Sequence, residues 1–235
     1  MFSQNWFKDL NGESNFNALP NICDFDKAIK YLEIGVFEGN AHLHMYSKLF
    51  RNQESTSIAI DPFLLMADWA PRHPTHPDAE DRFRANLHEY LDKITIIKNT
   101  SDNALPTLSG QSFDIIYIDG DHTAEAAYKD AKNSWNLLKK GGVMIFDDYL
   151  WHNFRHDDPL TYDLPKGYAI GEDNHPALGI NRFLEEHGKE YKLLGKEDGL
   201  THDCKILNLD PDSIKSYDYA TLRQTYNYQI LIQKQ

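Results

Sequence analysis

Acidic side chains and a histidine stand directly after two short apolar runs of the sequence. Asp119, Asp121 and His122 follow residues 115–118, and Asp147 and Asp148 follow residues 143–146. Four carboxylates gathered at one place repel one another, and each unit of pKa shift is worth ~1.4 kcal/mol, so a divalent cation is the usual compensation. Oxygen ligands of this kind suit Mg²⁺ or Ca²⁺. Loop acids that cap turns would show the same pattern, so the carboxylates alone leave both interpretations open.

The two apolar runs are predicted to be neighbouring parallel strands. Between them, residues 124–138 repeat apolar side chains such as Ala127, Ala131 and Trp135 at helical spacing, and the Lys-Lys-Gly-Gly run that follows ends the helix. A strand–helix–strand unit makes the strands parallel and brings their carboxyl ends to one edge of the sheet. Ligand sites in open α/β sheets lie at that edge, so the acids and His122 should meet there.

A glycine turn follows the first predicted strand, residues 31–34, and leads into a predicted helix over residues 41–50. Glycines at such a turn allow the backbone to approach a ligand closely. The second strand, residues 57–60, ends at Asp61, which is placed to accept hydrogen bonds from both hydroxyls of a ribose. The G-x-G-x-x-G dinucleotide fingerprint is not present, which argues against an NAD-dependent oxidoreductase.

Glu33, Gly35 and Gly39 combined with Asp61 resemble the S-adenosylmethionine site of class I methyltransferases. Residues 94–97 are predicted as the third strand, and the segment after it is where this family contacts the adenine. The residues that the resemblance assigns to the cofactor lie at the first four strand ends: Glu33, Gly35, Phe37, Gly39, Asn40, Asp61, Ser101, Asp102 and Asp119. Asn40 departs from relatives that carry a small hydroxyl residue after the second glycine.

The end of the fourth and fifth strands more specifically resembles the metal-dependent O-methyltransferases that include the catechol and macrolide-sugar enzymes. The resemblance implies that Asp119, Asp147 and Asp148 bind Mg²⁺ or another divalent cation such as Ca²⁺ or Mn²⁺. His122 stands where the catechol branch carries a catalytic lysine, as in some sugar-modifying relatives. We predict His122 as the general base, because its free pKa lies near neutrality, with Asp121 as the second candidate. A role for His122 in contacting only the cofactor or the backbone stays open.

The fold implied by this resemblance is a Rossmann-like seven-stranded α/β sheet in the order 3-2-1-4-5-7-6, with the last strand antiparallel and helices on both faces. A single domain covers residues 1–235. Residues 176–187 are predicted as a helix, and residues 191–194 and 228–232 as the last two strands. Residues 1–23 form an N-terminal extension that packs on the domain, packs on a second subunit, or forms a surface flap. The irregular stretches 62–78 and 149–175 are predicted as lid or acceptor loops, and residues 196–226 as a contact in a homo-oligomer.

The composition limits the classes of partner that the protein is expected to bind. The 235 residues carry a net charge of −12, which argues against nucleic acid and anionic membrane surfaces as partners. The hydrophobic fraction of 41% is that of a folded globule, and only two cysteines, which fit a reducing compartment, are present. With no membrane-length run and no signal-like N-terminus, we expect a soluble cytoplasmic protein.

The predicted reaction is methyl transfer from S-adenosylmethionine to a hydroxyl of a small molecule, such as a sugar or glycoside. Aromatic and hydrogen-bonding side chains in residues 149–175 suit a polyhydroxylated acceptor. The alternatives are a phenolic or catechol-type acceptor, an NAD-dependent oxidoreductase, and a non-catalytic metal- or glycan-binding module. The last would leave Glu33, Gly35 and Asp61 without a function.

Overall fold

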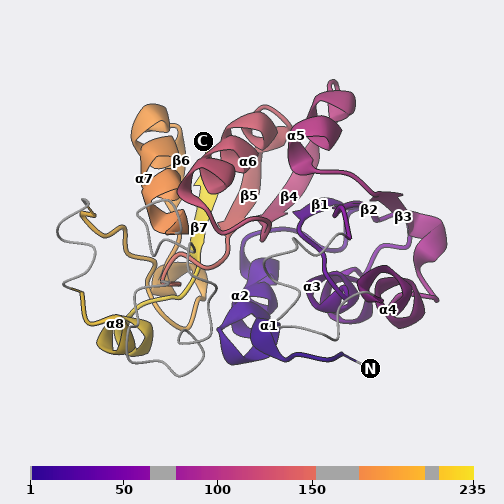
Figure 1. Ribbon diagram of the computed structural model, residues 1–235, viewed down its shortest axis with the longest axis horizontal. Coiled ribbons are helices and arrows are strands. Elements are labelled where there is room, and N and C mark those ends of the chain that lie inside the picture. The colour runs from indigo at the N-terminus through magenta and orange to yellow at the C-terminus, as the bar shows by residue number, and fades with distance from the viewer. Residues whose placement is uncertain (1, 64–77, 152–174, 210–216) are drawn as a thin grey trace, which may run out of the picture.

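The computed structural model describes residues 2–63, 78–151, 175–209 and 217–235, and its centre is a seven-stranded sheet (Figure 1). The strands, in chain order, are β1 (Lys30–Ile34), β2 (Thr56–Ile60), β3 (Ile94–Ile97), β4 (Phe113–Ile118), β5 (Leu138–Phe146), β6 (Tyr191–Leu193) and β7 (Ile230–Lys234). Their order in the sheet is β3-β2-β1-β4-β5-β7-β6. The strands from β3 to β5 are parallel, and β7 runs antiparallel to both of its neighbours. This confirms the predicted strand order and direction.

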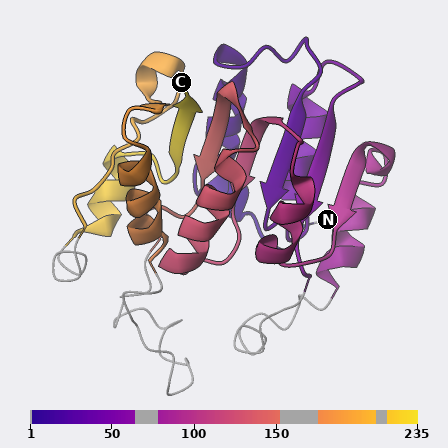
Figure 2. The ribbon, with the colours of Figure 1, turned by 90° about the horizontal axis from the view of Figure 1, so that it is seen from above.

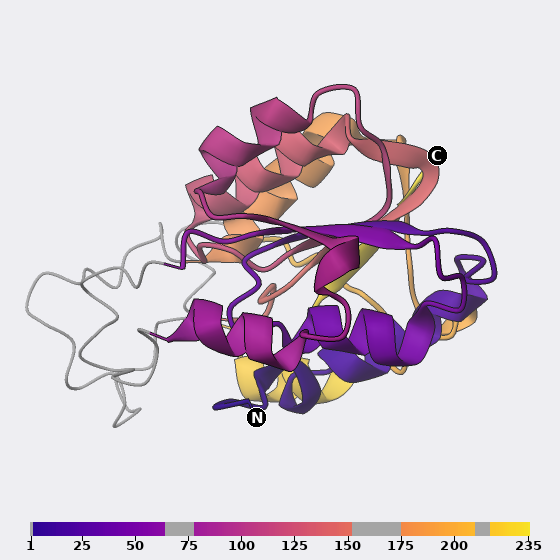
Figure 3. The ribbon, with the colours of Figure 1, turned by 90° about the vertical axis from the view of Figure 1, so that its right-hand side faces the viewer.

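Helices cover both faces of the sheet, so the molecule has three layers. The helices are α1 (Trp6–Asp9), α2 (Gly12–Ala18), α3 (Asn40–His44), α4 (Ala79–Asn86), α5 (Ser101–Ala104), α6 (Ala124–Trp135), α7 (Pro176–His187) and α8 (Tyr219–Thr225). Figure 3 shows α5, α6 and α7 on one face of the sheet and the remaining helices on the other. On the first face α6 and α7 lie side by side, as Figure 2 also shows. None of the helices within the described ranges is long and apolar enough to cross a membrane.

The middle of the sheet is buried on both faces, which explains the apolar runs of its strands. Ile115 and Ile116 of β4 point to opposite faces, yet both are completely buried, as are Val143 and Met144 of β5. These strands pair with Ile118 opposite Phe146, so their carboxyl ends lie at the same level. The acids that follow β4 and β5 are thereby brought together, as predicted.

The boundary between α6 and β5 corrects one prediction. The helix predicted over residues 124–138 ends at Trp135, and Leu138 instead begins β5 opposite Phe113. Leu138 is buried as a strand residue, and the register shifts between Phe113 and Ile115. The apolar spacing was wrongly extended by one helical turn, because Leu138 satisfies both periods. The predicted helix over residues 41–50 is α3 followed by a π-helical turn, Met45–Leu49.

The N-terminal extension packs on the domain. Phe16 of α2 is completely buried with its ring edge-on to Tyr117, at 5.1 Å between centroids. Asn15 donates to the side chains of Asn227 and Gln229, at 2.8 and 2.7 Å. These contacts decide against a surface flap. Most of the two predicted loops, 62–78 and 149–175, lies outside the described residues, as do residues 210–216 of the predicted oligomer contact. The roles of these segments stay predictions.

Candidate functional site

The glycine turn after β1 lies directly against the end of β4. Gly35 has φ +83, and a Cβ atom on it would stand 1.9 Å from the carbonyl oxygen of Asp119. Its amide donates to the carbonyl oxygen of Ile60 at 2.8 Å. Only glycine fits both this backbone conformation and this close approach. The predicted cofactor turn and the predicted acidic site are therefore neighbours in space.

Asp61 is held by two backbone amides of the same turn and by one amide that follows β2. One of its carboxylate oxygens, Oδ2, accepts from the amides of Val36 and Phe37, both at 2.9 Å, and Oδ1 accepts from Phe63 at 2.7 Å. Burial raises the pKa of Asp61, and these three hydrogen bonds oppose that rise by stabilising the charged form. The carboxylate is thus fixed at the end of β2, where a ribose acceptor was predicted.

Glu33 is placed deeper than its predicted cofactor role requires. It is almost completely buried, and its Oε2 accepts from the Tyr31 hydroxyl at 2.7 Å and contacts His42 Nδ1 at 2.6 Å. The other ring nitrogen of His42 lies 2.8 Å from Ser57 Oγ on β2. Glu33 therefore joins β1 to α3 and β2, and its contact with a cofactor stays a prediction.

The remaining predicted cofactor residues also lie at the carboxyl edge of the sheet. Gly39, with φ +81, caps α3 and Asn40 begins it, while Ser101 and Asp102 form the first turn of α5. The Phe37 ring stacks on Trp6 of α1 at 5.9 Å between centroids. Their common location fits the predicted site, but no contact with a cofactor is tested.

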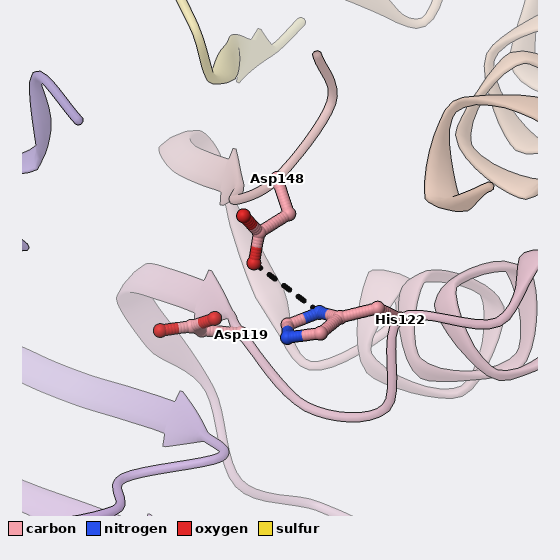
Figure 4. A group of neighbouring side chains, drawn as sticks. All are labelled: Asp119, His122 and Asp148. Carbon is pink, nitrogen blue, oxygen red and sulfur yellow. Dashed lines mark ion pairs between the residues drawn. The ribbon is translucent and has the colours of Figure 1, made fainter. Parts of the chain in front are cut away.

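The acidic site is formed by residues that directly follow β4 and β5. Asp119, His122 and Asp148 each offer one ligand atom, and these atoms lie within 4.8 Å of one another. Figure 4 shows the two carboxylates and the imidazole turned toward a common centre. His122 Nδ1 lies 3.2 Å from Asp148 Oδ2, and Nε2 lies on the side of Asp119. This arrangement could hold a cation or guide a proton.

Asp147, predicted as a metal ligand with Asp119 and Asp148, contacts other groups in the structure. Its Oδ2 accepts from the Tyr117 hydroxyl, and its Oδ1 accepts from the amide of Asp148 at 2.7 Å. His122, predicted as a base, stands in the group instead. The metal roles of all three aspartates stay predictions, and the geometry favours Asp119 and Asp148.

The two candidate bases occupy different settings. Asp121 is exposed and accepts from the amide of Thr123 at 2.8 Å, so it caps the loop before α6. His122 is partly buried between Asp148 and the Trp151 ring, whose centroid is 5.3 Å from that of the imidazole. A neutral ring with its proton on Nδ1, the nitrogen that faces Asp148, would carry its basic lone pair on Nε2. The geometry favours His122.

Burial and mutual repulsion dominate the electrostatics of this edge. Burial raises the pKa of Asp119 well above its usual value, and the charges of Asp147 and Asp148 raise it further. Burial, followed by the charge of Asp148, raises the pKa of Asp147 to about 7. Carboxylates that resist losing their protons in this way are stabilised by a nearby positive charge. The donor set therefore fits a divalent cation.

Two tyrosines that the sequence analysis did not assign to the site contact these acids. Tyr117 donates to Asp147, and Tyr228 donates to Asp148 Oδ1 at 2.6 Å. A signal for Tyr117 existed, because alternation along a strand places residues 117 and 119 on the same side of the sheet. No comparable signal existed for Tyr228, which reaches the site from the other end of the sequence.

Comparisons with known proteins agree with this geometry. Residues 32–149, half of the chain, match a family model described as a methyltransferase domain. The chain is 31% identical over 142 residues to the uncharacterized protein R132 of Acanthamoeba polyphaga mimivirus, covering 57% of this chain and 59% of that protein. It is 30% identical over 122 residues to the O-methyltransferase hkm8 of Aspergillus hancockii, covering 51% of this chain and 42% of the relative. The chain thus spans only about half the length of these relatives.

A solved structure with a similar fold is the O-methyltransferase from Bacillus cereus in complex with SAH. The TM-score is 0.51 at 15% identity, and the similarity covers 96% of this chain and 90% of the other. At this level of identity the likeness concerns the fold alone.

Proposed function

The chain belongs to the methyltransferase-domain family, and from this membership we propose that it is an S-adenosylmethionine-dependent O-methyltransferase acting on a hydroxyl of a sugar or another polyhydroxylated small molecule. The observation that carries the proposal is the acidic site with His122, which lies against the glycine turn after β1. The glycine turn would bind the methyl donor, and the acidic site would bind the acceptor.

The donor side is supported by Asp61 and the turn that it holds. Asp61 is a fixed acceptor at the end of β2, and Gly35 lets the turn lie directly against the backbone of Asp119. The Bacillus cereus structure contains SAH, the product that remains once S-adenosylmethionine has given up its methyl group. When bound, the donor supplies a methyl carbon whose bond to sulfur breaks as the acceptor oxygen bonds to it.

The acceptor side is supported by the carboxylates at the ends of β4 and β5. Asp119 and Asp148 would hold a divalent cation such as Mg²⁺, with Asp147 beside them, because their mutual repulsion calls for a positive charge. When bound, such a cation lowers the pKa of a hydroxyl that it contacts. A sugar hydroxyl has a high pKa, so a sugar acceptor and a cation requirement support each other.

His122 is the proposed general base. Asp148 Oδ2 lies 3.2 Å from Nδ1 and would orient the ring, so that Nε2 takes the hydroxyl proton as the methyl group is transferred. Trp151 packs beside the imidazole and presents an apolar wall next to the polar site. An aromatic ring beside hydrogen-bonding groups suits the mixed apolar and polar surface of a sugar.

The proposal is tested by following transfer of a labelled methyl group from S-adenosylmethionine to a panel of sugars, glycosides and phenols. We expect labelling of a sugar hydroxyl with Mg²⁺ present. EDTA should slow labelling by on the order of 10²-fold or more, since a Lewis acid supplies several kcal/mol, and added Mg²⁺ should restore it. Labelling of phenols alone would contradict the sugar class, and full activity after EDTA would contradict the cation. Calorimetry that detects NAD binding but not S-adenosylmethionine would contradict the reaction.

A further inference from the structure

Two buried tyrosine hydroxyls are the direct hydrogen-bond donors to the acids after β5. Tyr228, just before β7, donates to Asp148 Oδ1 at 2.6 Å, while Asp148 Oδ2 faces His122. Asp148 has φ +54, a backbone conformation that non-glycine residues adopt only when their surroundings hold them there. Both oxygens and the backbone of this aspartate are thus fixed by the fold.

Tyr117 makes the equivalent contact with Asp147. Its hydroxyl donates to Asp147 and also lies 3.3 Å from Asp119 Oδ2, so it stands between two acids that repel each other. Gln229 Nε2 donates to the Tyr117 oxygen at 3.4 Å, which leaves the hydroxyl proton for the carboxylates. The Gln229 amide is itself oriented by Asn15 of α2, at 2.7 Å.

Both contacts depend on one segment, residues 227–229, immediately before β7. Two adjacent residues of this segment serve the two contacts: Tyr228 reaches Asp148, and Gln229 reaches Tyr117. The carbonyl oxygen of Tyr228 also accepts from the amide of Leu150 at 3.2 Å, which ties the segment to the chain that follows the acids. One segment from the far end of the sequence therefore sets the positions of the acids at the end of β5.

We propose that Tyr228 and Tyr117 are positioning residues that hold the carboxylates of Asp148 and Asp147 in the arrangement that takes up the cation. The inference rests on the cation site of the proposed function. Groups that hydrogen-bond to metal ligands orient them, and their loss weakens metal binding or activity ~10–100-fold.

The test measures the affinity of the full chain for Mn²⁺, added without methyl donor or acceptor. The free ion is followed by its electron paramagnetic resonance signal. Tyr228→Phe and Tyr117→Phe remove only the hydroxyl and should each weaken binding ~10–100-fold. Tyr149→Phe is the matched control. The Tyr149 hydroxyl is equally buried, and it donates to Asn181 at 2.8 Å while accepting from Leu207 at 2.7 Å.

The control separates positioning from stability. All three variants lose a buried hydrogen bond and should lower Tm by similar amounts, but only Tyr228→Phe and Tyr117→Phe should lose Mn²⁺ affinity. Calorimetric affinity for S-adenosylmethionine should stay within about twofold, since Asp61 is held by other groups. Wild-type binding with no difference between Tyr228→Phe and Tyr149→Phe overturns this inference alone. No Mn²⁺ binding by the wild-type chain overturns the proposed cation site and the inference together.

Discussion

Two regions of the carboxyl edge hold buried carboxylates in different ways. At the end of β2, Asp61 accepts hydrogen bonds from three backbone amides, which are neutral donors fixed by the turn itself. At the ends of β4 and β5, three aspartates lie close together, and the donors that reach them are chiefly tyrosine hydroxyls and an imidazole. The region at the end of β2 thus stabilises one carboxylate, whereas the region at the ends of β4 and β5 brings several carboxylates together.

This difference indicates what each region can recognise. A lone carboxylate held by amides, which oppose the rise of its pKa through burial, serves as a rigid acceptor for neutral hydroxyl donors. A group of carboxylates whose pKa values rise through burial and mutual repulsion attracts a positive charge instead. The two regions should therefore respond to substitution separately, one through donor binding and the other through the cation and the acceptor.

The largest effect is expected for His122→Ala in the acidic region. Loss of the base should slow turnover by ~10²–10⁴-fold, or ~3–5 kcal/mol in the activation barrier. Binding of S-adenosylmethionine should remain nearly intact, because Asp61 and its turn lie apart from the imidazole. Rates under saturating substrates, together with calorimetry of the donor, would show both results.

Asp121→Asn distinguishes the two candidate bases. Asp121 is exposed and caps the loop before α6, so this substitution should cost far less turnover than His122→Ala. If Asp121→Asn proved the more damaging change, the proton acceptor would be Asp121, and His122 would have only a positioning role.

Asp130 extends the comparison to a carboxylate outside both regions. Burial raises its pKa from 3.8 to about 7, against a hydrogen bond from Ser101 that lowers it. The folded state then holds a proton that the unfolded state has released, so this group's contribution to stability is present below pH 4 and is lost as the pH rises to about 7. The loss should total roughly 4 kcal/mol, at ~1.4 kcal/mol per pKa unit.

The measurement is urea unfolding of the wild type and Asp130→Asn between about pH 4.5 and 8. The amide does not titrate, so the stability of the variant relative to the wild type should rise across this range and level off above about pH 7. Glu125→Gln, on the exposed side of the same helix, should show no such trend. A constant difference between the Asp130→Asn and wild-type curves would mean that Asp130 titrates normally in the folded protein.

The sequence predicted the parallel core of the fold and the residues at its edge because both depend on local patterns. The strand order is confirmed, and Asp119 and Asp148 meet because alternating strands and helices bring carboxyl ends together. The contacts that complete the site could not be predicted in this way. Tyr228 reaches Asp148 across 80 residues of sequence, and Asn15 reaches Gln229 across 214. No periodic pattern within a single segment predicts contacts between residues so far apart in the sequence.

Side-chain direction was the second limit. Asp147 and Asp148 are adjacent, and no local pattern distinguishes their roles. In the structure the left-handed backbone of Asp148 turns its carboxylate toward His122, while Asp147 lies beside Tyr117. Glu33 likewise contacts His42 in the interior, a partner that the strand pattern does not predict, and its contact with the cofactor stays a prediction. The position of a residue along a strand therefore predicts where its backbone lies, but not which partner its side chain contacts.

The last expected effect concerns the region at the end of β2. Asp61→Ala removes the acceptor proposed for the ribose hydroxyls, and each charge-assisted hydrogen bond that is lost costs ~1.5–3 kcal/mol, or roughly 10- to 150-fold in affinity. Because Asp61 also holds the amides of Val36 and Phe37, the glycine turn should loosen and the protein should lose some stability. Mn²⁺ affinity should stay within about twofold of the wild type, since the tyrosines and not Asp61 hold the acidic residues. Calorimetry of both ligands, with the exposed Asp24→Ala as control, measures this separation. Equal loss of both affinities would mean that the turn and the acidic residues act as one unit through Gly35 and Asp119, and the distinction between the two regions would be wrong.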